Sequence, residues 1–393
     1  MTLTGKTSDS SFLPKRIPEI DGLRGIAILG VLAFHLFGEG INYEQSHWLI
    51  NCLAEISKYG ANGVALFFVI SGFLIGGILI DNHDSPNYFK TFYVRRIFRI
   101  FPLYYGLIVI FYILSHANSY HLILIPEWML GFTFSSKWYL IFAQNFPMVR
   151  DGNLGTGILA PTWSLAVEEQ FYLTLPFIIR FVPRKFLTSI ILALFGGATI
   201  FRAIIWYQTS SLFATKFLMP SCLDLLMIGV LIAILLRFPK SLILMERYGL
   251  KLLIAVFLIL MICLSILSNL VLKYSPKLEE NPFILVATFL SLIYGLLLIL
   301  AVISKPKEII NKILCNRILR KFGELSYFIY LFHIGIYFFI SWQMGITTKP
   351  PFGMIWFVEV GLTLLITFVL AQLSFEYFEK PLIDYGHKFK YEN

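Results

Sequence analysis

The chain has 393 residues, of which 58% are hydrophobic, 17% aromatic and only 14% charged. Soluble domains carry roughly 25% charged residues, so this composition excludes a soluble globular protein and indicates an integral membrane protein. The net charge of +9 does not argue for nucleic-acid binding, because the positive residues lie in short loops between apolar runs, where they orient membrane helices.

Ten apolar segments are long enough to cross a membrane, which predicts an all-α bundle of about ten transmembrane helices. In chain order they cover residues 21–38, 63–80, 97–115, 163–180, 186–206, 217–237, 251–271, 284–303, 324–343 and 353–377. The first follows Lys15 and Arg16, as in a signal peptide, but no small-x-small cleavage pattern comes after it. We therefore expect it to be retained as a transmembrane helix.

An eleventh apolar segment, residues 120–143, is interrupted by Pro126, Glu127 and Lys137. If it does not cross, most of the 32 Lys and Arg residues fall in cytoplasmic loops and helix ends. If it crosses, every later loop changes sides and violates the positive-inside rule. The sequence therefore predicts both termini in the cytoplasm and residues 116–162 as a re-entrant or lid insertion on the outer side.

No repeat of solenoid period, low-complexity tract or soluble terminal region divides the chain, so residues 1–393 are expected to form a single domain. The cysteines are scattered and mostly lie in or beside apolar segments, at Cys52, Cys222, Cys263 and Cys315. This spacing indicates neither a disulfide framework nor a metal site.

Charged residues stand inside the first predicted helix, where Asp21 and Arg24 precede His35. At ~100° and ~1.5 Å per residue, eleven residues return to within ~20° of the starting direction, so Arg24 and His35 share one helical face. Ionisable groups at bilayer depth cost on the order of 3 kcal/mol each and are retained mainly where they line a polar cavity or take part in chemistry.

Arg95, Arg96 and Arg99 lie at the start of the third predicted helix with spacings of three and four, so they form one basic face. On the predicted topology this face suits a phosphorylated ligand that arrives from the cytoplasm. Aromatic residues and Pro102 are interleaved with the arginines, which favours binding over a plain stop signal. The alternative is that the arginines only anchor the helix to anionic lipid.

Two other predicted helices carry polar side chains. Ser71 lies in the second, beside glycines at a small-xxx-small spacing that by itself indicates helix packing. Ser164, Glu168 and Tyr172 fall on one face of the fourth at a spacing of four. An acidic residue in a first helical turn is also favoured by the helix dipole without any further role.

His35 and His333 are the only histidines of the seven that fall inside predicted spans. A lone buried histidine is usually a satisfied core residue. These two, however, accompany Arg24, Glu168 and Asp224 in one bundle, and so many buried polar groups require a shared network.

Together these strings resemble the membrane-bound acyltransferase 3 family, which acylates cell-envelope polysaccharides, lipid-linked sugars and related acceptors. The resemblance covers nearly the whole chain. It is carried by residues 21–25 with His35, 67–73, Arg95 and Arg96 with Arg99, 163–165 with Glu168, 326–331 with His333, and Glu379 before Pro381.

The resemblance implies a ten-helix domain that takes an acyl group, often acetyl, from cytoplasmic acyl-coenzyme A and delivers it to a hydroxyl, often on the outer side. The resemblance implies functional roles for Arg24 and His35, which match the arginine and histidine of the family's first helix. It implies the same for Arg96 and Arg99, which match the family's arginine pair near the third helix. Some relatives carry a C-terminal extracytoplasmic domain that completes the transfer; only 14 residues follow Glu379 here, so we expect transfer to finish within the membrane domain.

Acyl transfer from a thioester to an alcohol needs a base for the hydroxyl, donors for the oxyanion and a holder for the coenzyme phosphates. We expect His35 to act as general base or transient acyl acceptor, and Glu168 to orient the acceptor or His35. The expected phosphate-binding residues are Arg24, Arg95, Arg96 and Arg99, and the secondary candidates are Asp21, Ser71, Tyr330 and His333. Neither a Gly-x-Ser-x-Gly elbow nor a zinc-binding His-Glu-x-x-His motif is present, so no metal is expected.

Two other functions remain open. A secondary transporter of a saccharide or organic anion would also place polar residues at bilayer depth, although no self-similarity between the halves supports it. A carbohydrate- or lipid-binding protein without catalysis is the third, opposed by the presence of both Arg24 and His35. The resemblance also implies a bacterial cytoplasmic membrane, contact with its lipids and an envelope-glycan acceptor such as lipopolysaccharide, capsule or exopolysaccharide.

Overall fold

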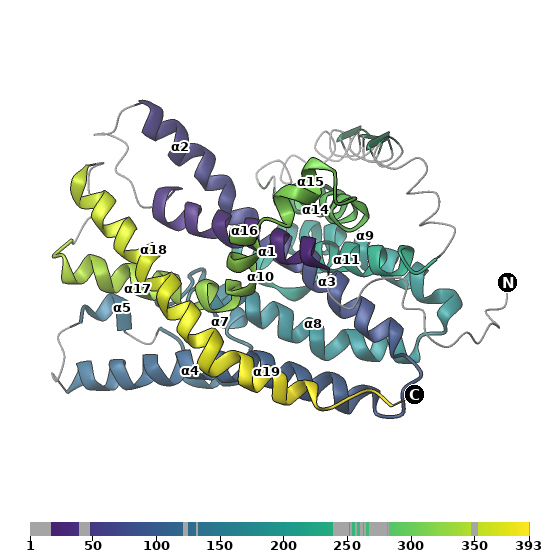
Figure 1. The fold of residues 1–393 in the computed structure, drawn as a ribbon, viewed down its shortest axis with the longest axis horizontal. Helices are drawn as coiled ribbons and strands as arrows, with labels where there is room; N and C mark the ends of the chain where they lie inside the picture. The colour runs from purple at the N-terminus through teal and green to yellow at the C-terminus, as the bar shows by residue number, and fades with distance from the viewer. Residues whose placement is uncertain are drawn as a thin grey trace.

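The computed structural model describes residues 17–38, 48–120, 125–130, 133–238, 283–346 and 353–392, with Asn281 and scattered helical residues between 251 and 266. Every regular element in this part of the chain is a helix, and none of these residues forms a strand. The predicted all-α class is therefore confirmed (Figure 1).

Six helices of the described part are long and apolar enough to cross a membrane: Pro18–Gly38, Ile50–Asp81, Tyr88–Ser119, Arg184–Thr209, Phe283–Ile303 and Met354–His387. A seventh is added if Arg317–Glu324 and Ser326–Gln343, which meet at 74°, count as one span. Ten crossings with cytoplasmic termini stay a prediction, and the expected span 251–271 lies mostly outside the described residues.

The described residues between 17 and 120 form four helices, α1 to α4, and two short helical turns. Helix α1 (Pro18–Ala33) continues into a π-helical turn, η1 (Phe34–Gly38), which carries His35. Helix α2 (Trp48–Lys58) is joined through η3 (Tyr59–Asn62) to α3 (Gly63–Asp81). Helix α4 spans Tyr88–Ser119, so the arginine cluster lies within a helix that begins earlier than the predicted residue 97.

Between α4 and the next long helix, the described residues form only short helices. These are α5 (Glu127–Leu130), α6 (Ser136–Leu140) and α7 (Asn145–Asp151). Each is far shorter than the roughly 20 residues that a membrane helix needs. Helix α4 continues to Ser119, past the predicted start at residue 116, and the insertion over 116–162 and its side of the membrane stay predictions.

The middle of the chain forms α8 (Thr162–Phe181), α9 (Arg184–Thr209) and α11 (Leu223–Leu235). The single helix predicted over 217–237 is wrong at its start. Helix α10 (Leu212–Phe217) ends there, and a 3₁₀ turn, η4 (Met219–Cys222), precedes α11. Pro220 lies in this turn and lacks the N–H that a continuous α-helix would use.

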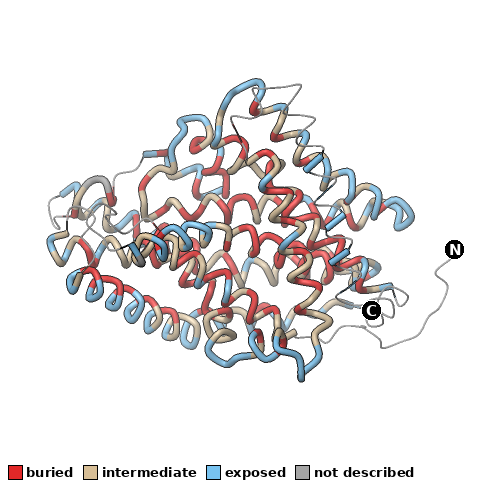
Figure 2. The backbone as a smooth tube through the Cα atoms, turned by 90° about the horizontal axis from the view of Figure 1, so that it is seen from above, coloured by how far each residue is buried: buried red, intermediate tan, exposed pale blue. Residues whose placement is uncertain are grey.

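The last third contains α14 (Phe283–Ile303), α15 (Ile309–Leu314), α16 (Arg317–Glu324), α17 (Ser326–Gln343), α18 (Met354–Ser374), η5 (Phe375–Glu379) and α19 (Lys380–His387). In Figure 1, α1, α3 and α11 occupy the middle of the bundle, and the yellow α18 and α19 reach α4 at its edge. Figure 2 shows buried residues concentrated inside the bundle and exposed ones along its rim.

Two glycines allow neighbouring helices to pack closely near the cavity described below. A Cβ at Gly25 would overlap the carbonyl oxygen of Leu319 in α16, and one at Gly72 would overlap that of Leu226 in α11. Small residues at such crossings let helix backbones approach in membrane bundles. The neighbouring residues Arg24 and Ser71 are thereby held in position on α1 and α3.

Candidate active site

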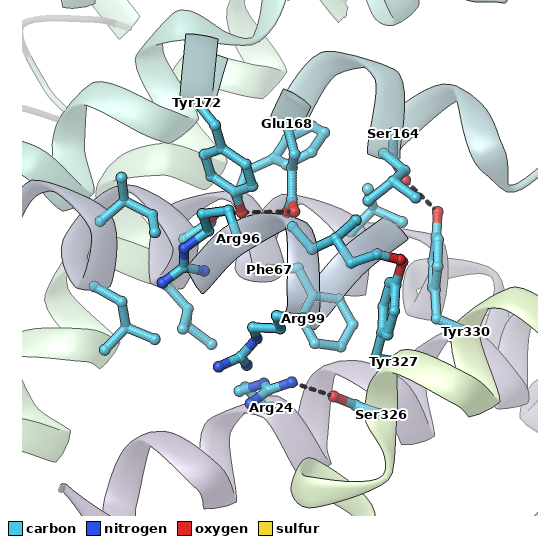
Figure 3. A pocket seen from close by; sticks show the side chains of 18 residues that line it. Arg24, Phe67, Arg96, Arg99, Ser164, Glu168, Tyr172, Ser326, Tyr327 and Tyr330 are labelled. Atoms are coloured by element: carbon cyan, nitrogen blue, oxygen red, sulfur yellow. Dashed lines mark hydrogen bonds between the residues drawn. The ribbon is translucent and has the colours of Figure 1, made fainter. Parts of the chain in front are cut away.

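A cavity lies where α1, α3, α4, α8 and α17 meet, with about 840 Å³ of empty space that is partly open to the outside (Figure 3). Six of the predicted site residues line it: Arg24, Ser71, Arg96, Arg99, Glu168 and Tyr330. The remaining polar lining residues of the described chain are Ser164, Tyr172, Ser326 and Tyr327. Segments more than 300 positions apart in the sequence thus meet in one cavity.

Three guanidinium groups gather at one end of this cavity (Figure 3). Arg24 donates from Nη2 to Ser326 Oγ at 2.9 Å, and Ser326 donates to the carbonyl of Gly323 at 2.8 Å. Arg96 lies over the ring of Tyr172 at 5.7 Å. Arg99 follows Arg96 by three residues on α4, so both point to the same side.

Glu168 is the carboxylate of the cavity, and a hydrogen-bonded chain fixes it. Tyr172 donates to Glu168 Oε2 at 2.9 Å, one helical turn along α8. The Tyr172 oxygen is 2.5 Å from Ser71 Oγ; because its single proton is used on Glu168, Ser71 is the donor in that bond. Glu168 also interacts electrostatically with all three arginines, so the cavity keeps an excess of positive charge and suits an anionic ligand.

At the other end of the cavity, two hydroxyls share a carbonyl. The Ser164 and Tyr330 oxygens are 2.6 Å apart, and both also lie within hydrogen-bond distance of the Pro161 carbonyl, at 3.2 and 3.1 Å. The ring of Tyr330 packs against Phe67 with centroids 6.2 Å apart. These hydroxyls are donors at the end farther from the arginines (Figure 3).

His35 and His333 form a pair beside this end, and neither lines the cavity. His333 Nε2 lies 3.2 Å from His35 Nδ1, and the His333 ring centroid is 6.4 Å from that of Tyr330. The prediction that Arg24 and His35 share one helical face assumed that the first helix is a regular α-helix as far as His35. In the structure α1 ends at Ala33, and the π-helical turn η1 aims His35 at α17.

The hydrogen bonds of the pair assign its protons. His333 Nδ1 faces the carbonyls of Ile329 and Tyr330 at 2.8 and 3.0 Å, so it carries the proton and its Nε2 is an acceptor. His35 Nδ1 must then donate, to His333 Nε2 and to the Val31 carbonyl at 3.1 Å. In this tautomer His35 Nε2 has a lone pair with no hydrogen-bond partner among the described residues, which is the state of a general base.

Besides the two histidines, two further predicted site residues do not line this cavity. Arg95 donates from Nε to the carbonyl of Phe389 at 2.7 Å and lines a second, smaller cavity together with Arg96 and Arg99. Asp21 lies one turn before Arg24 on α1 and interacts with it electrostatically. The predicted three-arginine face is thus divided between two cavities.

Asp224, whose role the sequence left open, belongs to a separate buried cluster. Arg202 Nη2 on α9 lies 2.7 Å from Asp224 Oδ2 on α11, and neither side chain is exposed to solvent. Thr288 on α14 donates to the same carboxylate oxygen at 2.8 Å. The guanidinium beside Asp224 thus comes from α9.

Sequence reasoning missed Ser326 and Tyr327 as cavity residues, and it noted Ser164 and Tyr172 only as a helical face. The spacing of four from Ser164 to Tyr172 was a usable signal. Ser326 belongs to the motif of residues 326–331, but that motif does not reveal its contact with Arg24, which is 302 positions away.

The membrane-length helices indicate a multi-pass membrane protein, and its arginine-rich cavity beside a histidine pair is suited to an anionic ligand. A family model described as an acyltransferase domain matches residues 17–375 of the chain. The chain therefore belongs to this acyltransferase family. This confirms the resemblance noted from the sequence motifs.

Among the relatives, the peptidoglycan O-acetyltransferase OatA of Listeria monocytogenes is 30% identical over 96% of this chain. The O-acetyltransferase OatA of Staphylococcus aureus is 26% identical over 98% of this chain. The chain spans 58% and 60% of the length of these two proteins. No solved structure matches it.

Proposed function

We propose that this protein is a membrane O-acyltransferase that moves an acyl group, in the simplest case acetyl, from acyl-coenzyme A to a hydroxyl of a cell-envelope glycan. The observation that carries the proposal is one cavity with three arginines at one end and, beside the other end, a histidine whose Nε2 is an available base. The name of the Listeria relative, a peptidoglycan O-acetyltransferase, supports a glycan acceptor, and peptidoglycan is the first to test.

In the proposed reaction, His35 Nε2 takes the proton of the acceptor hydroxyl, and the oxygen attacks the thioester carbonyl. A C–O bond forms, the C–S bond breaks, and the proton passes from His35 to the departing thiolate, so the reaction balances without another reactant. Ser164 or Tyr330 could donate to the oxyanion once its proton turns away from the Pro161 carbonyl, which accepts it in this structure. Arg24, Arg96 and Arg99 hold the anionic donor. Glu168 orients the reacting groups between these arginines and the histidine.

The donor is proposed to enter from the cytoplasm and the acceptor from the outer side. Support comes from the charge pattern of the loops, which predicts the arginine end of α4 on the cytoplasmic side. The proposed location is the cytoplasmic membrane of a bacterium, in agreement with the organisms of the relatives.

The test is acetyl-coenzyme A consumption by the purified protein in detergent, followed by thiol release, with and without peptidoglycan fragments. Acceptor-dependent release that Arg24→Ala abolishes would support the proposal. No release and no coenzyme binding with any envelope glycan would reject it. Saccharide uptake into proteoliposomes by that same preparation would favour the transporter.

A further inference from the structure

A second cavity adjoins the first and shares two arginines with it. It has about 390 Å³ of empty space, also partly open, and its polar lining residues are Arg95, Arg96, Arg99, His387 and Tyr391. Arg96 and Arg99 line both cavities, so their side chains form a common wall. A ligand that passes this wall would occupy both cavities.

Tyr391, which lines the second cavity, lies in the segment that follows α19 and packs against the start of α4 (Figure 1). Arg95 donates to the Phe389 carbonyl at 2.7 Å and lies 5.2 Å from the ring centroid of Tyr391. Asn87, just before α4, donates to the Lys390 carbonyl at 3.0 Å. These bonds hold His387 and Tyr391 against the arginine cluster.

The polar groups of this cavity offer many donors and no carboxylate among its described lining residues. The Tyr391 hydroxyl is buried and has no hydrogen-bond partner among the described residues. Burial raises the pKa of the Tyr391 phenol, so it remains a neutral donor near pH 7. An anion with several acceptor oxygens, such as a phosphate, would satisfy these groups together.

We propose that the second cavity binds the phosphate-bearing nucleotide end of the acyl-coenzyme A donor, and that His387 and Tyr391 are phosphate-binding residues. The acyl-bearing arm then passes Arg96 and Arg99 into the first cavity, toward Tyr330 and the histidine pair. This inference rests on the proposed function, because it assumes that donor. A phospholipid headgroup offers the same phosphate chemistry, and the experiment separates the two sources.

The experiment measures binding of acetyl-coenzyme A and of S-acetylpantetheine, which lacks the nucleotide and its phosphates, to the purified protein by calorimetry. Loss of one hydrogen bond to a charged group weakens binding by roughly tenfold or more. We therefore expect Tyr391→Phe and His387→Ala to weaken acetyl-coenzyme A binding by about that factor and to leave S-acetylpantetheine binding unchanged. The matched controls are Tyr385→Phe and His116→Ala, which line neither cavity.

Equal acetyl-coenzyme A affinity in Tyr391→Phe, His387→Ala and wild type would overturn the inference and leave the proposed function standing. Absence of acetyl-coenzyme A binding in the wild type would instead defeat the proposed donor. If phosphatidylglycerol binds the wild type more tightly than His387→Ala while acetyl-coenzyme A binds both equally, the cavity is a lipid site and the inference is wrong. Tyr391→Phe keeps the ring under Arg95, so it tests the hydroxyl without removing the packing.

Discussion

His35 can act as a base only while its Nδ1 keeps the proton. The Val31 carbonyl and His333 Nε2 both accept from that nitrogen, and carbonyls of α17 in turn hold the proton of His333. Backbone groups of two helices therefore set the tautomer. In the proposed mechanism His333 would act through His35, as a positioning residue.

For His35→Ala we expect acceptor-dependent transfer to fall by about 10²–10⁴-fold, because that is the usual contribution of a general base. The variant should retain acetyl-coenzyme A binding and a normal gel-filtration profile, since its side chain is only partly buried. His116→Ala, at the far end of α4, serves as the control and should transfer at the wild-type rate. Wild-type turnover in His35→Ala would remove His35 from the mechanism.

For His333→Ala we expect a smaller loss, about tenfold in kcat with KM for the donor unchanged, because His35 remains but loses an acceptor for its Nδ1 proton. His333→Gln offers a side-chain oxygen as acceptor and should recover part of the rate. A purely packing role predicts instead that Ala and Gln reduce kcat alike.

The sequence of each helix was enough to predict the motif residues that it contributes to the site. The contacts between site residues of different helices could not be predicted in this way. Arg24, Arg96 and Glu168 are charged groups in apolar helices, which is an unusual and visible pattern. The bond between His35 and His333 joins residues 298 positions apart and depends on a π-helical turn that hydropathy does not reveal.

At the scale of helices, apolar segments predicted where helices occur better than where they bend. The segment 217–237 looked continuous because apolar content hides the effect of Pro220. Likewise the bend of 74° between α16 and α17 falls inside the predicted span 324–343. It places Ser326 at the first residue of α17, where it accepts from Arg24.

Gly72→Ala should lower the melting temperature, because its Cβ would overlap the Leu226 carbonyl of α11 and overpacking costs about 1–3 kcal/mol. Gly361→Ala on α18 is the matched control, since no atom outside its own helix lies within 4 Å of the added Cβ. Differential scanning fluorimetry in detergent compares them. Equal melting temperatures for the two variants would show that α3 and α11 separate without cost.

For the molecule as a whole, the Arg202–Asp224 pair joins α9, α11 and α14 away from the cavity. Arg202→Met should destabilise the protein by about 3–5 kcal/mol, because it leaves a buried carboxylate without its counter-charge. Adding Asp224→Leu should restore much of the stability, and the double variant should keep the donor KM. A double variant that stays as unstable as Arg202→Met would argue against charge pairing.

The predicted topology places α2 outside and the loop before α15 in the cytoplasm. In a cysteine-free background, a membrane-impermeant maleimide should label restored Cys52 in intact cells, because this side chain is exposed. Lys307→Cys, also at an exposed position, should react only after the membrane is permeabilised. The opposite labelling pattern would invert every assignment of sides.

The wall formed by Arg96 and Arg99 has a consequence for how fast such an enzyme would run in a cell. A donor bound across both cavities would leave its spent carrier with the phosphates still on the cytoplasmic side of that wall. Free coenzyme A would then occupy the same pockets as the next acylated molecule. The pace of envelope acylation would therefore follow the ratio of acylated to free coenzyme A, and thus the metabolic state of the cell.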